Sequence, residues 1–393
     1  MKATYRVLLA APGSGRLLSA SLASKLPINA FSVSALLLLS PRYSYAAAGA
    51  AIATMLIANA ASSPARGRLA DRHPMPAVLG VCLVGYLIGI GGLCVCAAAR
   101  LPVGLVLASA ALIGLSFPPV SILLRGHWVA IAGEGGLTAA NSVESALMDL
   151  TLITGPALAA WLSVAVSPFA PFVASSALMA VAVVLMSTVR VGPRAPTEHT
   201  GDWAGPLRVR PLRRVLGALM FFAAALSVIE VVLPIYAQQH HVSGYSGGFL
   251  AALSVGSIVG ALMFGPMSSP RRRLLPALLV LFVAGALVLG FAMTIGPVAV
   301  LVMCPLAGLA IGSTFTHLYT AVWTVGPSGY ENETQGWATS LTTTGFAAGS
   351  AAGAAVVGLA GAPTFVLLSA PAALVAAALA LRGTRVRSVI AAP

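Results

Sequence analysis

The sequence predicts an all-α membrane protein with twelve transmembrane helices in two six-helix halves. Hydrophobic residues make up 59% of the 393 residues and charged residues only 8%, whereas a soluble domain is about half apolar and a quarter charged. The apolar residues are grouped in runs of the length, about 20 residues, that crosses a bilayer. The longest polar stretch lies at the middle of the chain, where a connection between two halves is expected.

Twelve apolar runs are predicted to be the spans, and the connections between them are too short to hold a soluble domain. The runs cover 16–39, 45–64, 77–98, 103–125, 138–163, 168–189, 214–237, 246–266, 274–294, 297–324, 336–360 and 363–382. All four cysteines fall within runs and are interpreted as small packing residues. We therefore expect no disulfide, no metal site and no cofactor.

The basic residues predict the orientation of the chain. It has 22 Lys and Arg against 9 Asp and Glu. With a cytoplasmic N-terminus, nineteen of the 22 fall in or beside inside segments, while Arg42 and Arg100 lie outside. The positive-inside rule then predicts a multi-pass protein of the cell membrane with both termini in the cytoplasm. The basic excess favours anionic lipid as a partner over nucleic acid, and we expect a monomer.

Residues 190–213 hold five arginines and four prolines and are interpreted as a cytoplasmic linker. The predicted halves are therefore 1–189 and 214–393. Internal repeats are typical of transporter folds. A shift of 198 residues places Gly67 on Gly265, which is followed by a second arginine cluster, and Gly155 on Gly353.

A charged segment, 65–76, separates the second and third runs. Its pattern Gly67-x-Leu69-x-Asp71-Arg72 resembles the signature of the major facilitator superfamily, although Pro74 stands where that signature has a second glycine. The resemblance implies twelve helices around a central cavity and transport by alternating access.

The resemblance also implies a conformational latch. Asp71 would dock on a helix N-terminus of the opposite half, near Thr334-Gln335, and stabilise the outward-facing state. Free amide groups and the helix dipole favour a carboxylate at such a position. The alternative is an ordinary charged cytoplasmic turn.

The fourth run contains Pro118-Pro119 and ends at Arg125. Arg125 either resembles the membrane-facing arginine of proton-moving members of the superfamily or extends its charge to the interface. The two prolines remove backbone donors and predict a kink in this helix, which serves either gating or passive packing.

Small residues mark two further helices. Gly155-Pro156 in the fifth run resembles the Gly-Pro motif of drug/proton antiporters. Gly345, Gly349 and Gly353 in the eleventh run are four residues apart, a spacing that lets helices approach closely. We expect packing first, and sliding of the fifth helix as the sharper alternative.

Four charged residues lie inside predicted spans: Lys25, Glu144, Asp149 and Glu230. A charge near the bilayer centre costs about 2.5–3.5 kcal/mol on insertion scales, so such residues are functional candidates. Glu144 and Asp149 are five residues apart and cannot share one helix face fully. Lys25 is expected to neutralise one of them.

Glu230 has no basic residue in its own helix and is the first candidate for proton coupling. A carboxyl group away from water can gain and lose a proton near neutrality. His317, among threonines of the tenth run, either relays protons, contacts substrate or packs as a hydrogen-bonded core histidine.

Several stretches resemble a group of actinobacterial members of the superfamily. They are 26–27, 117–120, 141–149 and 228–231, followed in the fifth run by Gly155-Pro156. This resemblance implies efflux. An arginine is usual in that group at the position of Lys25, and an acidic residue at the position of Leu150.

The leading hypothesis is a proton-coupled exporter of small apolar or amphipathic compounds. An importer or facilitator of sugars or nutrients is the alternative, although the spans offer few cavity residues for sugar beyond Asn29, Asn141 and Trp161. A sensor that does not transport is a third possibility. A membrane-embedded enzyme is disfavoured, because neither an H-E-x-x-H nor a G-x-G-D sequence occurs.

Overall fold

A computed structural model describes residues 2–189, 205–265 and 271–384. These residues form thirteen α-helices and three short 3-10 turns, without a strand. The helices before the linker are α1 (Lys2–Ala10), α2 (Ser14–Leu39), α3 (Tyr45–Arg72), α4 (Met75–Ala99), α5 (Val103–Leu115), α6 (Val120–Ala165) and α7 (Ala170–Thr188). The helices after it are α8 (Arg210–Gln239), α9 (Ser246–Phe264), α10 (Arg271–Ile295), α11 (Pro297–Val325), α12 (Glu331–Ala360) and α13 (Val366–Thr384).

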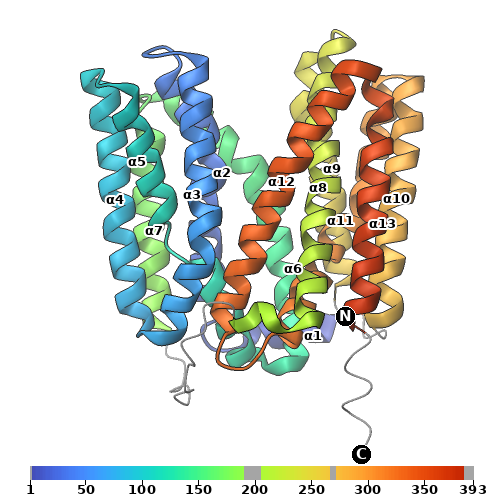
Figure 1. Ribbon diagram of the computed structural model, residues 1–393, viewed down its shortest axis with the longest axis horizontal. Coiled ribbons are helices and arrows are strands. Elements are labelled where there is room, and N and C mark those ends of the chain that lie inside the picture. Colours follow the sequence, from blue (N-terminus) through green and yellow to red (C-terminus); the bar gives the residue numbers. More distant parts are fainter. Residues whose placement is uncertain (1, 190–204, 266–270, 385–393) are drawn as a thin grey trace, which may run out of the picture.

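Two separate hydrophobic clusters divide the described residues into two bundles. The first cluster runs from Leu8 to Val189 and the second from Leu212 to Ala380. Figure 1 shows the bundles meeting through α3, α6 and α12 at one end and diverging toward the other. We call the end where they meet the basic end, because Arg72 ends α3 there and Arg210 begins α8 there.

Eleven of the described helical segments are long and apolar enough to cross a membrane. They correspond to eleven of the twelve predicted runs. The exception is α12, which covers the run 336–360 but is not among them. Its first half holds five threonines and two glutamates, and the helix packs against α3 and α8.

The predicted boundary of the second span was wrong. The helix does not end near residue 64 but continues through the charged segment to Arg72. Ser44 caps its first turn by accepting a hydrogen bond from the amide of Ala47, 3.0 Å away. Gly67 and Asp71 therefore lie on one face of a helix, one turn apart, and only His73-Pro74 form the turn.

The fourth span is broken where a kink was predicted. Helix α5 ends at Leu115 and α6 begins at Val120, so Ser116 to Pro119 form a non-helical connection. The carbonyl group of Phe117 accepts a hydrogen bond from the guanidinium of Arg66 on α3. Pro118 and Pro119 lack backbone N–H donors, and the buried guanidinium of Arg66 supplies a hydrogen-bond donor at this point.

Helix α6 contains the end of the fourth span and the whole of the fifth, and these two parts are separated by a bend at Gly133, where φ is 66°. Arg125 lies within the first part and does not end it, because the helix continues to Ile131. Glycine adopts this positive φ without the steric cost that a Cβ would bring.

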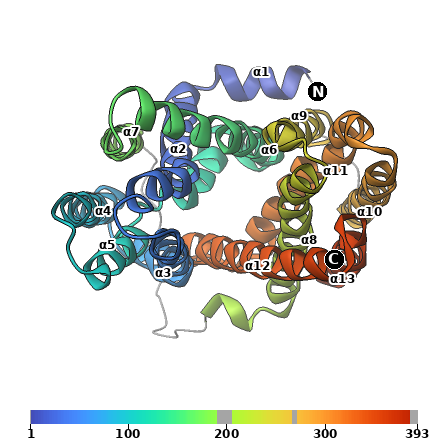
Figure 2. The ribbon, with the colours of Figure 1, turned by 90° about the horizontal axis from the view of Figure 1, so that it is seen from above.

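The N-terminal helix α1 lies on the outside of the bundles, beside α6 and α9 (Figure 2). The hydroxyl of Tyr5 donates to the carbonyl of Leu262 at 3.0 Å. Of the predicted linker, residues 190–204 lie outside the described part, and α8 begins at Arg210, four residues before the predicted span. Residues 266–270, within the second copy of the charged segment, are also outside it.

Candidate functional site

Lys25 on α2 and Glu144 on α6 form an ion pair inside the first bundle. Both residues are 7% exposed. The hydroxyl of Ser21 donates to the Oε2 atom of Glu144 at 2.7 Å, and the indole of Trp128 donates to its Oε1 atom at 3.1 Å. Both carboxylate oxygens therefore have partners, and the negative charge is neutralised within one bundle.

Asp149 lies one and a half turns further along α6 and faces the other bundle. Its Oδ2 atom accepts a hydrogen bond from the hydroxyl of Ser257 on α9 at 2.5 Å. Glu230, on α8 of the other bundle, is likewise half-buried. Neither acid takes part in the two ion pairs found among the described residues. Each bundle thus carries one half-buried acid that forms no ion pair within the described residues.

Further polar contacts join the bundles beside this pair. The amide of Asn141 on α6 donates to the hydroxyl of Thr320 on α11 at 2.9 Å, and Thr316 donates to Ser145 at 3.3 Å. His317, buried on the same helix, has its Nε2 atom 3.3 Å from the carbonyl of Phe264. That carbonyl belongs to the last residue of α9, so His317 contacts the end of a helix.

At the basic end, Asp71 binds the N-terminus of α12. Its carboxylate oxygens accept hydrogen bonds from the amides of Asn332 and Glu333 at 3.1 and 2.9 Å. The predicted position, Thr334-Gln335, is two residues too far into the same helix. Arg68 completes the contact with two hydrogen bonds to the Glu333 carboxylate, 3.0 and 2.6 Å long.

Gly67 allows α3 to approach α12 this closely. A Cβ at Gly67 would lie 2.3 Å from the carbonyl oxygen of Asn332, and one at Gly336 would lie 2.4 Å from that of Ser63. Any side chain at either position would push the two bundles apart, because backbone atoms cannot yield as a flexible side chain can.

Arg125 also crosses between the bundles. Its guanidinium donates to the Oε1 atom of Gln335 on α12 at 3.0 Å and lies 3.8 Å above the ring of Tyr319 on α11. Both alternatives weighed from the sequence assumed a different environment, facing either the membrane or the interface. The structure places Arg125 in the contact between the bundles, next to the Asp71 contact.

The predicted glycines lie at close helix contacts within one bundle. A Cβ at Gly345 or Gly349 would lie 2.2 Å from a carbonyl oxygen of α8, and one at Gly353 would lie 3.2 Å from the Cα atom of Val228. Gly155 faces Asn29 on α2, with its next residue Pro156 inside the continuous helix α6. These positions agree with a function in close helix packing, and the geometry does not test sliding of the fifth helix.

The sequence analysis missed the functions of Arg66, Arg68 and Ser257. Arg66 was counted as an interfacial charge, yet it is 6% exposed and also donates to the Oδ1 atom of Asn59 at 2.6 Å. Arg68 had a usable signal, because it lies one residue after Gly67 and is oppositely charged to Glu333 at the predicted docking site. Ser257 had none, since serine is common in the spans.

Residues 17–354 match the family model of the Major Facilitator Superfamily. Among solved structures, the chain is similar to the human organic anion transporter MFSD10 (TETRAN), with 18% identity and a TM-score of 0.76 over 94% of this chain and 99% of that one.

It is also similar to a bacterial homologue of the iron transporter ferroportin in an outward-facing state (15% identity, TM-score 0.78, 94% and 98% covered). The fucose:proton symporter FucP of E. coli gives 15% identity and a TM-score of 0.72 over 94% and 98%. None of the curated proteins matches the sequence. At these identities the likeness shows the fold alone.

Proposed function

Because the chain belongs to the Major Facilitator Superfamily, we propose that it is a proton-coupled secondary transporter that exports small apolar or amphipathic compounds. The fold is that of a multi-pass membrane transporter, with neighbours whose cargoes range from organic anions to iron and fucose. The fold alone therefore does not identify the transported compound, and the proposal depends on the charged residues inside the membrane.

The observation that carries the proposal is that Asp149 and Glu230, inside predicted spans of opposite bundles, form no ion pair within the described residues. A carboxylate inside a membrane span without a cation to neutralise it is costly to keep ionised, so both acids are suited to hold a proton. They belong to opposite bundles, so movement of the bundles changes their mutual distance. Proton binding and conformation are thereby linked, as coupling requires.

We place twelve spans in two halves with both termini and the basic end in the cytoplasm, on the positive-inside rule. The contacts of Asp71, Arg68 and Arg125 then close the cytoplasmic side, and this conformation is outward-facing. Transport requires these contacts to break, which makes Gly67, Asp71 and Arg125 parts of a latch. Arg72, exposed beside it, and the Pro118–Pro119 break belong to the moving region.

The importer hypothesis has less support. Two of the side chains that a sugar site could use are engaged in helix contacts: Asn29 donates to Thr151 and Asn141 to Thr320, both at 2.9 Å. The third, Trp161, is 62% exposed on the far part of α6. The three candidates named from the sequence are thus either engaged in helix contacts or exposed. The transporter family likewise argues against a membrane-embedded enzyme.

The test is efflux of amphipathic dyes from proteoliposomes of known orientation under an imposed pH gradient. We expect collapse of the gradient to abolish efflux. The double variant Asp149→Asn, Glu230→Gln should lose efflux by at least about tenfold, an effect of about 1.4 kcal/mol. Glu331→Gln removes one charge outside the pair and serves as the control. Efflux that survived in the double variant would sink the coupling assignment.

A further inference from the structure

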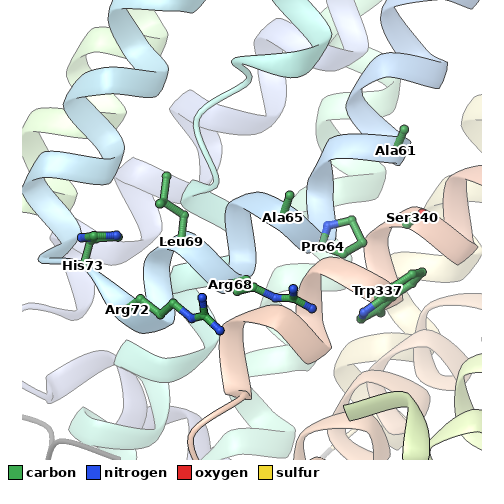
Figure 3. A pocket seen from close by; sticks show the side chains of 9 residues that line it. All are labelled: Ala61, Pro64, Ala65, Arg68, Leu69, Arg72, His73, Trp337 and Ser340. Carbon is green, nitrogen blue, oxygen red and sulfur yellow. The ribbon is translucent and has the colours of Figure 1, made fainter. Parts of the chain in front are cut away.

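An open pocket of about 540 Å³ lies between α3 and α12 at the basic end. Figure 3 shows the side chains of Arg68 and Arg72 on the α3 side and the indole of Trp337 across from them on α12. The pocket therefore has one wall from each bundle. None of the transport residues inside the membrane lines it.

The polar part of the pocket presents positive charge. Arg72 and His73 are exposed at its end, and Arg72 is in neither of the two ion pairs of the described residues. The two neighbouring acids, Asp71 and Glu333, do not line the pocket. Asp71 binds backbone amides of α12, and the Glu333 side chain is 1% exposed. An occupant would meet the guanidinium groups and not the carboxylates.

The remaining α3 wall is apolar and continues away from the arginines. Ala61, Ala65 and Leu69 line it at four-residue spacing, which places them on one helix face. Leu69 is 38% exposed, and Ile57, one turn before Ala61, is 68% exposed. Cationic groups at a helix end and a shallow apolar strip along that helix match a molecule with an anionic head and an apolar chain.

We propose that this pocket binds an anionic phospholipid of the surrounding leaflet, with its phosphate between Arg72 and Arg68 and an acyl chain along Ala65 and Ala61. Guanidinium groups suit phosphate oxygens, and basic pockets between transmembrane helices bind lipid headgroups. Because the walls come from both bundles, the bound lipid stabilises the conformation that is closed at the basic end. The conformational consequence rests on the proposed alternating access, whereas the binding does not.

A second basic pocket supplies a matched control. It is lined by Arg210, Arg213 and Arg214 at the start of α8 and by Leu379 of α13. Both helices belong to the second bundle, so a lipid held there cannot join the bundles. Arg213→Gln removes the same charge as Arg72→Gln at the same end of the protein.

The experiment measures the distance between spin labels at Tyr45→Cys and Tyr245→Cys, after replacement of the four native cysteines. Both tyrosines are exposed, at 77% and 52%, and lie at the diverging end. The protein is placed in nanodiscs of phosphatidylcholine with or without phosphatidylglycerol. We expect phosphatidylglycerol to increase the long-distance population about threefold or more, since a differential affinity of that size shifts a two-state equilibrium measurably.

Two variants test the site itself. Arg72→Gln removes the cation, and Ala65→Phe fills the apolar strip without changing any charge. We expect both to abolish the effect of phosphatidylglycerol, and Arg213→Gln to retain it. Three outcomes would each overturn the proposal. The long-distance population could be the same in phosphatidylcholine with and without phosphatidylglycerol, inorganic phosphate could reproduce the increase, or the increase could persist in both variants. None of these readouts requires transport, so failure here is distinct from failure of proton coupling.

Discussion

The two charged sites inside the membrane use the same residue types in opposite ways. Glu144 is neutralised by Lys25 and hydrogen-bonded by Ser21 and Trp128, all in the first bundle. Asp149, five residues later on the same helix, accepts a hydrogen bond from Ser257 of the second bundle and forms no ion pair within the described residues. The first site moves as a unit with its bundle, whereas the second exists only while the bundles are in this arrangement.

The difference teaches how to separate a structural charge from a working one. Removing one member of a buried, fully hydrogen-bonded ion pair strongly destabilises the protein, because the other charge is then left buried without a partner. Removing an acid that is in no ion pair leaves no buried cation behind. Stability and transport should therefore respond oppositely at the two sites.

The largest expected effect separates Glu144→Gln from Glu230→Gln. Glu144→Gln leaves the buried Lys25 unpaired and should lower the free energy of unfolding by about 3–5 kcal/mol. Glu230→Gln replaces an acid that has no cation and should change it by less than about 1 kcal/mol. Equilibrium unfolding by SDS in mixed micelles measures both.

A double variant checks the cause. Lys25→Met with Glu144→Leu replaces the whole pair by apolar residues and should recover most of the lost stability, since such replacements are often neutral. Dye efflux should persist in this variant if the pair is structural. A double variant as unstable as Glu144→Gln would show that the charges themselves are not the reason.

The next effect concerns the contact between the bundles at Asp149. Ser257→Ala removes a hydrogen bond to a charged group, a loss of about 1.5–3 kcal/mol. Because that hydrogen bond joins two bundles, we expect its loss to change the free-energy difference between conformations and not the free energy of unfolding. The distance between labels at positions 45 and 245 reports it. Ser254→Ala, a buried serine one turn away on α9, should leave the distance distribution unchanged.

The smallest effect is expected at Trp128. Trp128→Phe removes the donor to the Oε1 atom of Glu144 but leaves Lys25 and Ser21 in place, so the free energy of unfolding should fall by about 1 kcal/mol. Transport should be unaffected. Trp161→Phe, at a 62% exposed position, is the matched control. Equal losses in both variants would mean that the indole hydrogen bond adds nothing.

The sequence predicted the position of eleven spanning helices and the helix to which Asp71 binds. It narrowed the partner of Lys25 to Glu144 or Asp149 without choosing between them. It did not predict that α3 continues to Arg72, and at Pro118-Pro119 it predicted a kink where the helix is interrupted from Ser116 to Pro119. Both outcomes depend on hydrogen bonds between helices. The amide of Asn332 on α12 donates to Asp71, and the guanidinium of Arg66 on α3 donates to the carbonyl of Phe117.

The sequence by itself determined the membrane class, the number of long apolar segments and the charge asymmetry, because each depends on residues close together in the chain. Only the tertiary structure decided which charges are neutralised. Glu144 meets a cation 119 residues before it and Asp149 a hydroxyl 108 residues after it. That choice follows from how α6 is rotated and packed between two bundles, a property of many contacts at once and of no single segment.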